Sequence, residues 1–186
     1  MHYFKELSDL FSKIEITEKM GKIISFDKAI SEITSLITAL DKKENKIMLI
    51  GNGGSASIAS HIATDFLKNA KVRAIVFNDA SLLTCLSNDL GYEAVFQKPL
   101  EMLSRKGDIL FSISSSGKSK NILNATEEVR GRGCFIITLS GFEKGNPLRT
   151  LGDINFYVPS SSYGYAEITH LAICHLIVDY FIKNNG

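Results

Sequence analysis

The hydrophobic positions of the chain change their period near residue 45. Before it, apolar residues recur at helical spacing over residues 3–19 and 26–42, which predicts two amphipathic helices. After it, short aliphatic runs alternate with longer helical stretches. The runs cover residues 46–50, 73–77, 108–113, 133–139 and 154–158. They are apolar at nearly every position, which is typical of strands buried on both faces of a parallel sheet.

This alternation predicts an α/β fold, in which a doubly wound parallel sheet lies between two layers of helices as in flavodoxin. The intervening helices are expected at residues 55–68, 80–88, 92–104, 118–130 and 165–184. We expect one domain over residues 1–186, with helices in 1–44 and the α/β core in 45–186. The two leading helices exceed what this sheet needs. We therefore expect them to pack on a neighbouring subunit in an oligomer.

Two loops rich in small residues follow predicted strands. Gly51-Asn52-Gly53-Gly54-Ser55 comes directly after the first aliphatic run, and Ser114-Ser115-Ser116-Gly117-Lys118-Ser119 follows the third. Small residues at a strand-to-helix junction let backbone N–H groups and hydroxyls converge on an anion at the helix N-terminus. Because both loops lie at strand carboxyl ends, we expect them to bind one phosphorylated metabolite.

Three other readings of these loops deserve comparison. Gly51–Ala56 satisfies the dinucleotide fingerprint G-x-G-x-x-[GA], with Asp79 as the acidic residue, but that reading needs no second serine-rich loop. Ser112–Ser119 nearly matches the phosphate loop of NTPases, but Ser112 replaces the first glycine and falls inside a predicted strand. Either loop alone could be a tight turn with a helix cap. We expect no nucleotide cofactor.

The composition limits the classes of function that we expect for this chain. Of 186 residues, 45% are hydrophobic and 22% charged, and the formal net charge is +1. This balance gives no electrostatic reason to expect binding to nucleic acid or to a membrane. The N-terminus lacks a signal-peptide pattern, and no apolar run predicts a membrane span. The three cysteines fit no metal or redox spacing. We interpret them as reduced packing residues of a cytoplasmic protein.

Several polar side chains interrupt apolar helical stretches. His61 and Asp65 are four residues apart and share a helix face one turn apart. In the final helix Glu167, His170 and His175 interrupt an apolar run, and Glu167 and His175 could reach one cavity. A histidine in such a helix is also compatible with a purely structural role. Near a bound phosphate, however, a carboxylate and an imidazole suit acid–base work on a sugar phosphate.

Taken together, these segments resemble the sugar isomerase (SIS) domain family, and within it the phosphoheptose isomerases. The likeness runs from about residue 26 to residue 184. It rests on the loop Gly51–Ser55, His61 with the carboxylate at 65, the segment Ser87–Tyr92, the loop Ile113–Ser119 and the pair His170 and His175. As a set these motifs are specific, whereas any one of them is not.

The resemblance implies a fold and an activity. Family members interconvert a ketose phosphate and an aldose phosphate in the bacterial cytoplasm, supplying heptose for lipopolysaccharide or capsule. The resemblance also implies a homotetramer whose active sites lie between subunits. Asp65 would be the general base and His175 its acid–base partner. The resemblance assigns phosphate and sugar binding to Asn52, Gly53, Ser55, Asn88, Asp89, Ser114, Ser115, Ser116, Ser119 and Glu167. Some members hold zinc, here at His61, Asp65, Glu167 and His175.

The chain departs from the family pattern at two places. The base is usually glutamate, and Asp65 is one methylene shorter. The usual Arg-x-Gln-Glu at the start of the last helix is replaced by Tyr165-Ala166-Glu167-Ile168. These departures keep a second hypothesis open. In that hypothesis the chain binds a sugar phosphate without chemistry, as a sensor or as a partner of the replication initiator.

Overall fold

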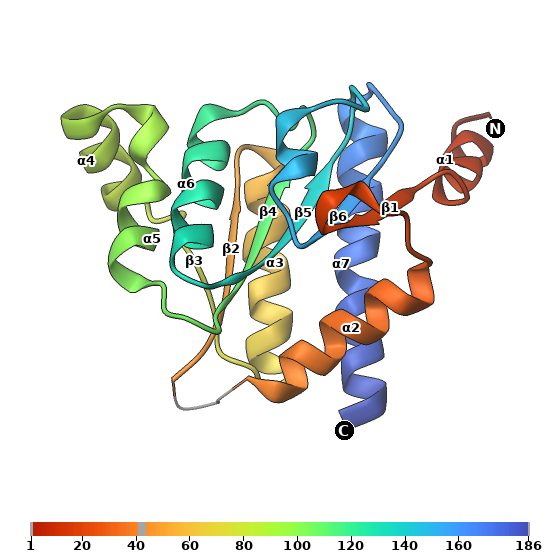
Figure 1. Ribbon diagram of the computed structural model, residues 1–186. Helices are drawn as coiled ribbons and strands as arrows, with labels where there is room; N and C mark the ends of the chain where they lie inside the picture. Colours follow the sequence, from red (N-terminus) through yellow and green to blue (C-terminus); the bar gives the residue numbers. More distant parts are fainter. Residues whose placement is uncertain (1, 41–43, 186) are drawn as a thin grey trace.

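One mixed sheet organises the chain. The structure is a computed structural model that describes residues 2–40 and 44–185 (Figure 1). Across these residues the sheet has six strands in the order β1-β6-β5-β4-β2-β3. The strands are β1 Glu15–Glu18, β2 Ile47–Gly51, β3 Ala74–Val76, β4 Ile109–Ser114, β5 Phe135–Ser140 and β6 Ile154–Tyr157. Five strands run parallel, and β1 pairs antiparallel with β6. The order of the parallel strands is that of the predicted flavodoxin-like fold.

Helices cover both faces of the sheet. The α-helices are α1 His2–Phe11, α2 Phe26–Ala39, α3 Gly54–Lys68, α4 Ala80–Leu90, α5 Gln97–Leu103, α6 Lys120–Gly131 and α7 Tyr163–Asn185. Short 3₁₀ turns are η1 Lys19–Gly21, η2 Tyr92–Ala94 and η3 Pro147–Thr150. The predicted helix at 92–104 is therefore divided into η2 and α5. Residues 41–43, at the end of the second predicted helix, lie outside the described residues.

Alternate residues of the strands enter two separate cores. Ile47 and Leu49 of β2 pack with α2, α3 and α7, whereas Met48 and Ile50 pack on the other side with α5 and α6. All four side chains have no exposed surface. This double burial explains the uninterrupted apolar runs of the sequence. It also produces the three layers seen in Figure 1.

The prediction of one helix over residues 3–19 is wrong in its second half. The helix α1 ends at Phe11, and Glu15–Glu18 form an edge strand, with Ile16 opposite Phe156 of β6. β-branched Ile16 and Thr17 favour this pairing. The free backbone groups of β6 supply partners that a local periodicity does not reveal. Thus the segment 1–44 contributes a strand as well as helices.

The second leading helix packs within its own chain. In α2, Ile30, Ile33 and Ile37 are buried in the same core as α3 and α7. Packing of the remaining surface of α2 on a neighbouring subunit stays a prediction. In α1, by contrast, Leu10 is the one buried residue.

The long helix α7 is apolar enough to cross a membrane by length and composition. However, Ile173, Ile177 and other residues of α7 belong to the core.

The cysteines differ in their surroundings. Cys134 and Cys174 are buried as expected, whereas Cys85 is exposed, so its interpretation as a packing residue is wrong. Burial raises the pKa of Cys134 to about 11 and that of Cys174 to about 12. These two thiols are therefore protonated and unreactive at neutral pH.

Candidate active site

The two small-residue loops lie at the point in the sheet where the strand order reverses. The strands β2 and β4 are neighbours, β3 lies outside β2, and β5 lies on the other side of β4. Adjacent connections that diverge in this way leave a crevice beyond the strand carboxyl ends. Because the loops follow β2 and β4, both border this crevice.

The loops line one cavity of about 260 Å³. Its walls are Asn52, Gly53, Gly54, Ser55, Ser114, Ser115, Ser116, Ser119, Tyr163 and Glu167. The sequence prediction that both loops face a common space is thereby confirmed. Tyr163 was not predicted, because nothing in the sequence indicates that the first residue of α7 reaches these loops.

The geometry of the cavity suits an anion. Gly53 has a positive φ of 54° immediately before α3, and a Cβ on Gly51 would lie 2.6 Å from the backbone of Ser55. The chain therefore needs glycine to bring the helix N-terminus this close to the strand. The Ser115 hydroxyl is buried and has no hydrogen-bond partner. Since an unpaired buried hydroxyl is costly, we interpret it as a group reserved for a ligand.

Asn52 joins the first loop to α6 and η2. Its Nδ2 donates to Asn121 Oδ1 at 2.9 Å, and its Oδ1 accepts from Asn121 Nδ2 at 2.9 Å and from the Tyr92 hydroxyl at 2.8 Å. Asn121 lies in the first turn of α6 and is 3% exposed. The side chain of Asn52 is therefore largely occupied by protein partners. Sequence reasoning missed Asn121 and Tyr92, because polar residues at these positions look like ordinary surface residues.

The side chain of Glu167, a residue of α7, lies against the start of α3. A Cβ on Gly54 would overlap the Glu167 carboxylate, so the two residues are in close approach. Glu167 is the one charged side chain among the described residues that line the cavity. No lysine or arginine in the described chain balances it there. Phosphate held in this cavity therefore relies on backbone N–H groups and hydroxyls.

A second cluster joins α3 and α7. The Oδ2 of Asp65 is 3.5 Å from His61 Nε2 and 3.5 Å from His175 Nδ1, and the imidazole rings are 5.1 Å apart. The side chain of Asp65 is 16% exposed, against 54% for His61 and 38% for His175. One ligand atom from each lies within 4.8 Å of the others. Two imidazoles and a carboxylate are donors that suit zinc and leave an open position.

Three of the four predicted metal ligands come together in this cluster, whereas Glu167 is outside it among the described residues, so the role of Glu167 as a ligand stays a prediction. Glu167 precedes His175 by eight residues, about 12 Å along α7, and its carboxylate is directed to Gly54. Likewise, none of the three cluster residues lines the cavity between the two loops. Ser55 and Asp65 are ten residues apart, about 15 Å along α3.

Asn88 and Asp89 stand apart from the cavity. Both are exposed in the last turn of α4, where Asn88 Nδ2 donates to Asp89 Oδ1 at 2.7 Å. Neither lines the cavity in the part of the chain that the structure describes. The following segment does border it, through the bond from Tyr92 to Asn52. The predicted sugar contacts of Asn88 and Asp89 stay a prediction.

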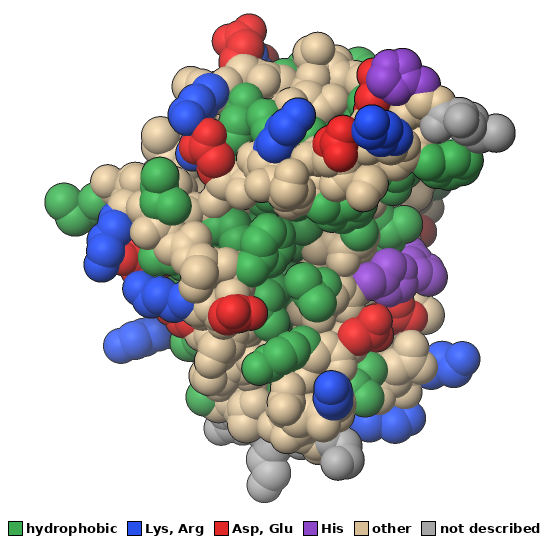
Figure 2. Space-filling view, turned by 90° about the vertical axis from the view of Figure 1, so that its right-hand side faces the viewer, with side chains coloured by type: hydrophobic (Ala, Val, Ile, Leu, Met, Phe, Trp, Pro, Cys, Tyr) green, Lys and Arg blue, Asp and Glu red, His purple; other side chains and the backbone are tan. Residues whose placement is uncertain are grey.

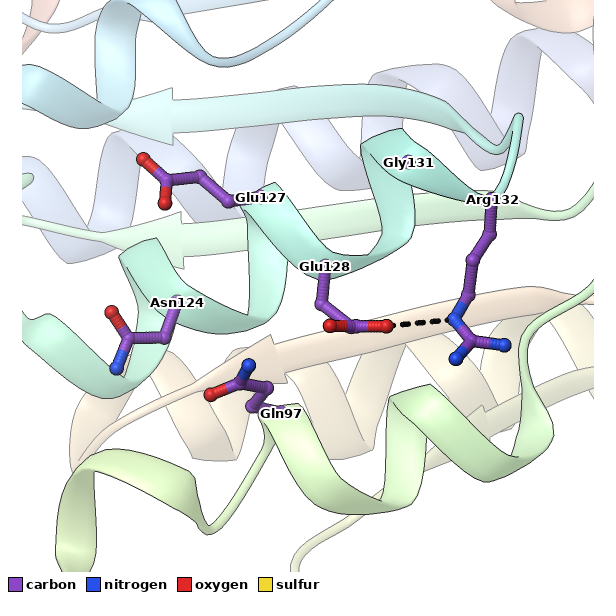
Figure 3. Close-up of a pocket in the computed structure, with 6 residues that line it drawn as sticks. All are labelled: Gln97, Asn124, Glu127, Glu128, Gly131 and Arg132. Carbon is purple, nitrogen blue, oxygen red and sulfur yellow. Dashed lines mark hydrogen bonds and ion pairs between the residues drawn. The ribbon is translucent and has the colours of Figure 1, made fainter.

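A larger hollow lies between α5 and α6 (Figure 3). It measures about 550 Å³ and is lined by Gln97, Asn124, Glu127, Glu128, Gly131 and Arg132. Arg132 is paired with Glu128 at 2.8 Å. The remaining Glu127 leaves the hollow acidic, so it does not suit a phosphate ester. The smaller cavity is the better candidate.

Comparison with known proteins identifies the family of the chain. Residues 2–141 match the profile of the SIS domain. The chain belongs to the SIS domain family. It is 37% identical to the phosphoheptose isomerase of Helicobacter hepaticus, over 85% of this chain and 83% of that protein. Against the phosphoheptose isomerase of Nitratiruptor sp. it is 42% identical, over 73% and 75%.

A solved structure has the same architecture. The phosphoheptose isomerase of Neisseria gonorrhoeae superposes with a TM-score of 0.80 and 27% sequence identity, covering 97% of this chain and 96% of that one. The predicted SIS-type fold is thus confirmed, and the resemblance extends over the whole fold, including the leading helices and strand.

Proposed function

We propose that this protein is a phosphoheptose isomerase, which converts sedoheptulose 7-phosphate into D-glycero-manno-heptose 7-phosphate. The observation that carries the proposal is the common cavity of the two loops, whose lining includes Ser115 with a buried hydroxyl that has no hydrogen-bond partner. The relatives named above are phosphoheptose isomerases. The product would supply heptose for lipopolysaccharide or capsule in the cytoplasm.

In this proposal the cavity holds the phosphate. Ser55, Ser114, Ser115, Ser116 and Ser119 donate hydroxyl hydrogens to phosphate oxygens or neighbouring sugar hydroxyls, together with N–H groups at the start of α3. Gly53 allows the close approach. Asn52 keeps the two loops at a fixed spacing through Asn121. Glu167 accepts from a sugar hydroxyl, since a carboxylate has no hydrogen to donate to phosphate.

The acid–base work falls to the second cluster. Asp65 moves a proton between C1 and C2 of the sugar through an enediol, and His175 exchanges the proton on the oxygen atoms. His61 holds the Asp65 carboxylate from the other side. Zinc would be held by His61, Asp65 and His175, and it would supply polarisation of the sugar carbonyl.

The cavity and the cluster of one chain are separated, and a second copy of the chain would place its own cluster opposite the cavity. We propose a homo-oligomer, as a tetramer, in which the cluster of one subunit faces the cavity of another. Exposed apolar side chains support this arrangement. Ile168, Leu176 and Tyr180 of α7 are each more than 40% exposed, although α7 is a core helix. Figure 2 shows hydrophobic side chains gathered on the side of the molecule that bears α1 and α2.

The alternative is a sugar-phosphate-binding protein without chemistry. The shorter Asp65 and the separation of cluster and cavity within one chain favour it. Incubation with sedoheptulose 7-phosphate in D₂O, with zinc or with EDTA, separates the two functions. An isomerase produces a new aldose signal by NMR and incorporates deuterium at C2. A sensor shows ligand shifts without either change, and that result would contradict the proposed function.

Replacing Asp65 by Asn tests the assignment of the base. The amide keeps the shape of the side chain but cannot take up a proton, so we expect turnover to fall by a factor of roughly 10²–10⁴. Affinity for inorganic phosphate should be unchanged, as measured by calorimetry. The matched control is Asp179→Asn, an exposed carboxylate of α7 outside the cluster. Full activity of Asp65→Asn would remove Asp65 from the mechanism.

A further inference from the structure

The serine-rich loop is supported from behind by the end of β5. The N–H of Gly141 donates to the carbonyl oxygen of Ser115 at 2.9 Å. A Cβ on Gly141 would lie 3.1 Å from the same oxygen, so the two backbones are in close approach. The position of Ser115, whose hydroxyl is unpaired in the cavity wall, therefore depends on where Ser140 and Gly141 lie.

His170 holds this end of the strand from α7. Its side chain is fully buried, and its Nε2 lies 3.2 Å from the carbonyl oxygen of Ser140. Because a carbonyl oxygen only accepts, Nε2 must carry the hydrogen. Nδ1 is then an unprotonated nitrogen, and no described group bonds to it. Burial lowers the pKa of His170 to about 4, which keeps the imidazole neutral in this tautomer at physiological pH.

A second buried side chain completes the support. Asn146 has no exposed surface, and its Nδ2 donates to Ser140 Oγ at 3.2 Å and to Gly141 O at 3.2 Å. The side chain of Asn146 also fills the space that a Cβ on Gly117 would need. Asn146 thus packs against Gly117 of the serine-rich loop. His170 reaches the Ser140 carbonyl from the helix side, and the Val158 N–H donates to the same oxygen at 2.8 Å.

We propose that His170 is a positioning residue of the phosphate cavity. Its Nε2–H fixes the Ser140 carbonyl, the adjoining Gly141 N–H fixes the Ser115 carbonyl, and Ser115 is thereby aimed at the phosphate. This inference rests on the proposed function of the cavity as a phosphate site. His170 touches neither the sugar nor the reacting carbons, so it acts on affinity and not on the proton transfer.

The test compares His170→Leu with His170→Gln, with inorganic phosphate as the probe. Leucine fills the space but removes the second donor to the Ser140 carbonyl, which then keeps only the Val158 N–H at 2.8 Å, whereas glutamine keeps an N–H donor in place of the imidazole. We expect His170→Leu to raise the Kd for phosphate and the KM for sedoheptulose 7-phosphate roughly tenfold, with kcat unchanged. His170→Gln should stay within about threefold of wild type, because the hydrogen bond is retained.

The control is Thr169→Val. The Thr169 hydroxyl is also buried on α7 and unpaired, so its loss breaks no described bond and should leave the Kd for phosphate unaltered. If His170→Leu does not fold, His170→Asn replaces it, since its amide is too short to reach Ser140 and should show the same loss.

Other outcomes are decisive. Folded His170→Leu with wild-type affinity would mean that His170 only packs, which overturns the inference. Equal weakening by the leucine and glutamine variants would overturn it too. Phosphate binding that depends on His170, in a protein that does not turn over the sugar, would support this inference while contradicting the proposed isomerase. Wild-type protein that binds no phosphate would overturn both.

Discussion

At the scale of single residues, charge is the unusual property of the phosphate cavity. Glu167 lies beside the N-terminus of α3, where a negative group is favoured by the helix dipole. A phosphate placed in the same cavity must share that position with a carboxylate. The repulsion between them reduces the affinity that the loops would otherwise give.

Replacing Glu167 by Gln should therefore tighten phosphate binding. Removing one negative charge from a partly solvated site corresponds to about 1 kcal/mol, or roughly a fivefold lower Kd. Calorimetry with inorganic phosphate measures this change. Glu127→Gln, an exposed glutamate of α6 outside the cavity, removes the same charge and should have no effect. Weaker binding by Glu167→Gln would show that the carboxylate assists phosphate binding.

His170 makes stability depend on pH. Its pKa in the folded chain is about 4, lowered by burial from an ordinary value of 6.5. The unfolded chain therefore takes up a proton on His170 at a higher pH than the folded chain does. The free energy of unfolding should fall between pH 6.5 and 4, by up to about 3 kcal/mol from this group. Urea titrations at a series of pH values measure the free energy of unfolding of wild type and of His170→Gln. The two should change differently with pH below 6.5 and in parallel above pH 7.

At the scale of elements, the serine-rich loop requires a backbone conformation that glycine adopts most readily. Gly117 has a positive φ of 63°, and a Cβ there would collide with the Asn146 side chain. Leu148 N–H donates to the Gly117 carbonyl at 3.1 Å. The serine-rich loop and the η3 turn are thus fitted to each other at this glycine.

Gly117→Ala should lower the free energy of unfolding by roughly 1–3 kcal/mol, since both the positive φ and the collision are unfavourable. It should also weaken phosphate binding, because the loop must shift to relieve the contact. Gly145→Ala is the control, as a Cβ on Gly145 meets nothing within 4 Å. Urea unfolding and phosphate calorimetry report the two effects. Equal stability and equal phosphate affinity of the two variants would show that the serine-rich loop and the η3 turn do not depend on their close contact at Gly117.

At the scale of the whole molecule, the proposed mechanism needs a second chain. Leu176 follows His175 in α7, and the side chains are 42% and 38% exposed; in the proposed oligomer the partner subunit covers both. Leu176→Lys should dissociate the oligomer, because a buried lysine without a partner is unfavourable. Turnover should fall in parallel, whereas phosphate binding by each chain persists.

Sedimentation velocity measures the size of the particle in both variants. Met102→Lys is the control, since Met102 is 71% exposed on α5, on the other side of the sheet. A wild-type monomer that turns over the sugar would contradict the proposed arrangement of subunits. An active monomeric Leu176→Lys variant would contradict it as well.

Local chemistry made much of this protein predictable from its sequence. Runs such as 47–50 have no polar position, because both faces of the strand are buried, and this indicated a parallel sheet. Glycine and serine at Gly51–Ser55 and Ser114–Ser119 mark strand-to-helix junctions where backbone donors are exposed. Parallel strands end at one edge, so the common cavity followed from the fold class.

Only the tertiary structure decided the features that depend on distant partners. Residues 15–18 form a strand because the edge of β6 is open to them, and no local pattern shows an open edge. Glu167 and His175 share a helix, yet the helix rise separates them, so one reaches the cavity and the other Asp65. Asn121, Tyr92 and Tyr163 join the site through folding alone. Sequence therefore specified which chemistry is available, whereas packing determined which groups meet.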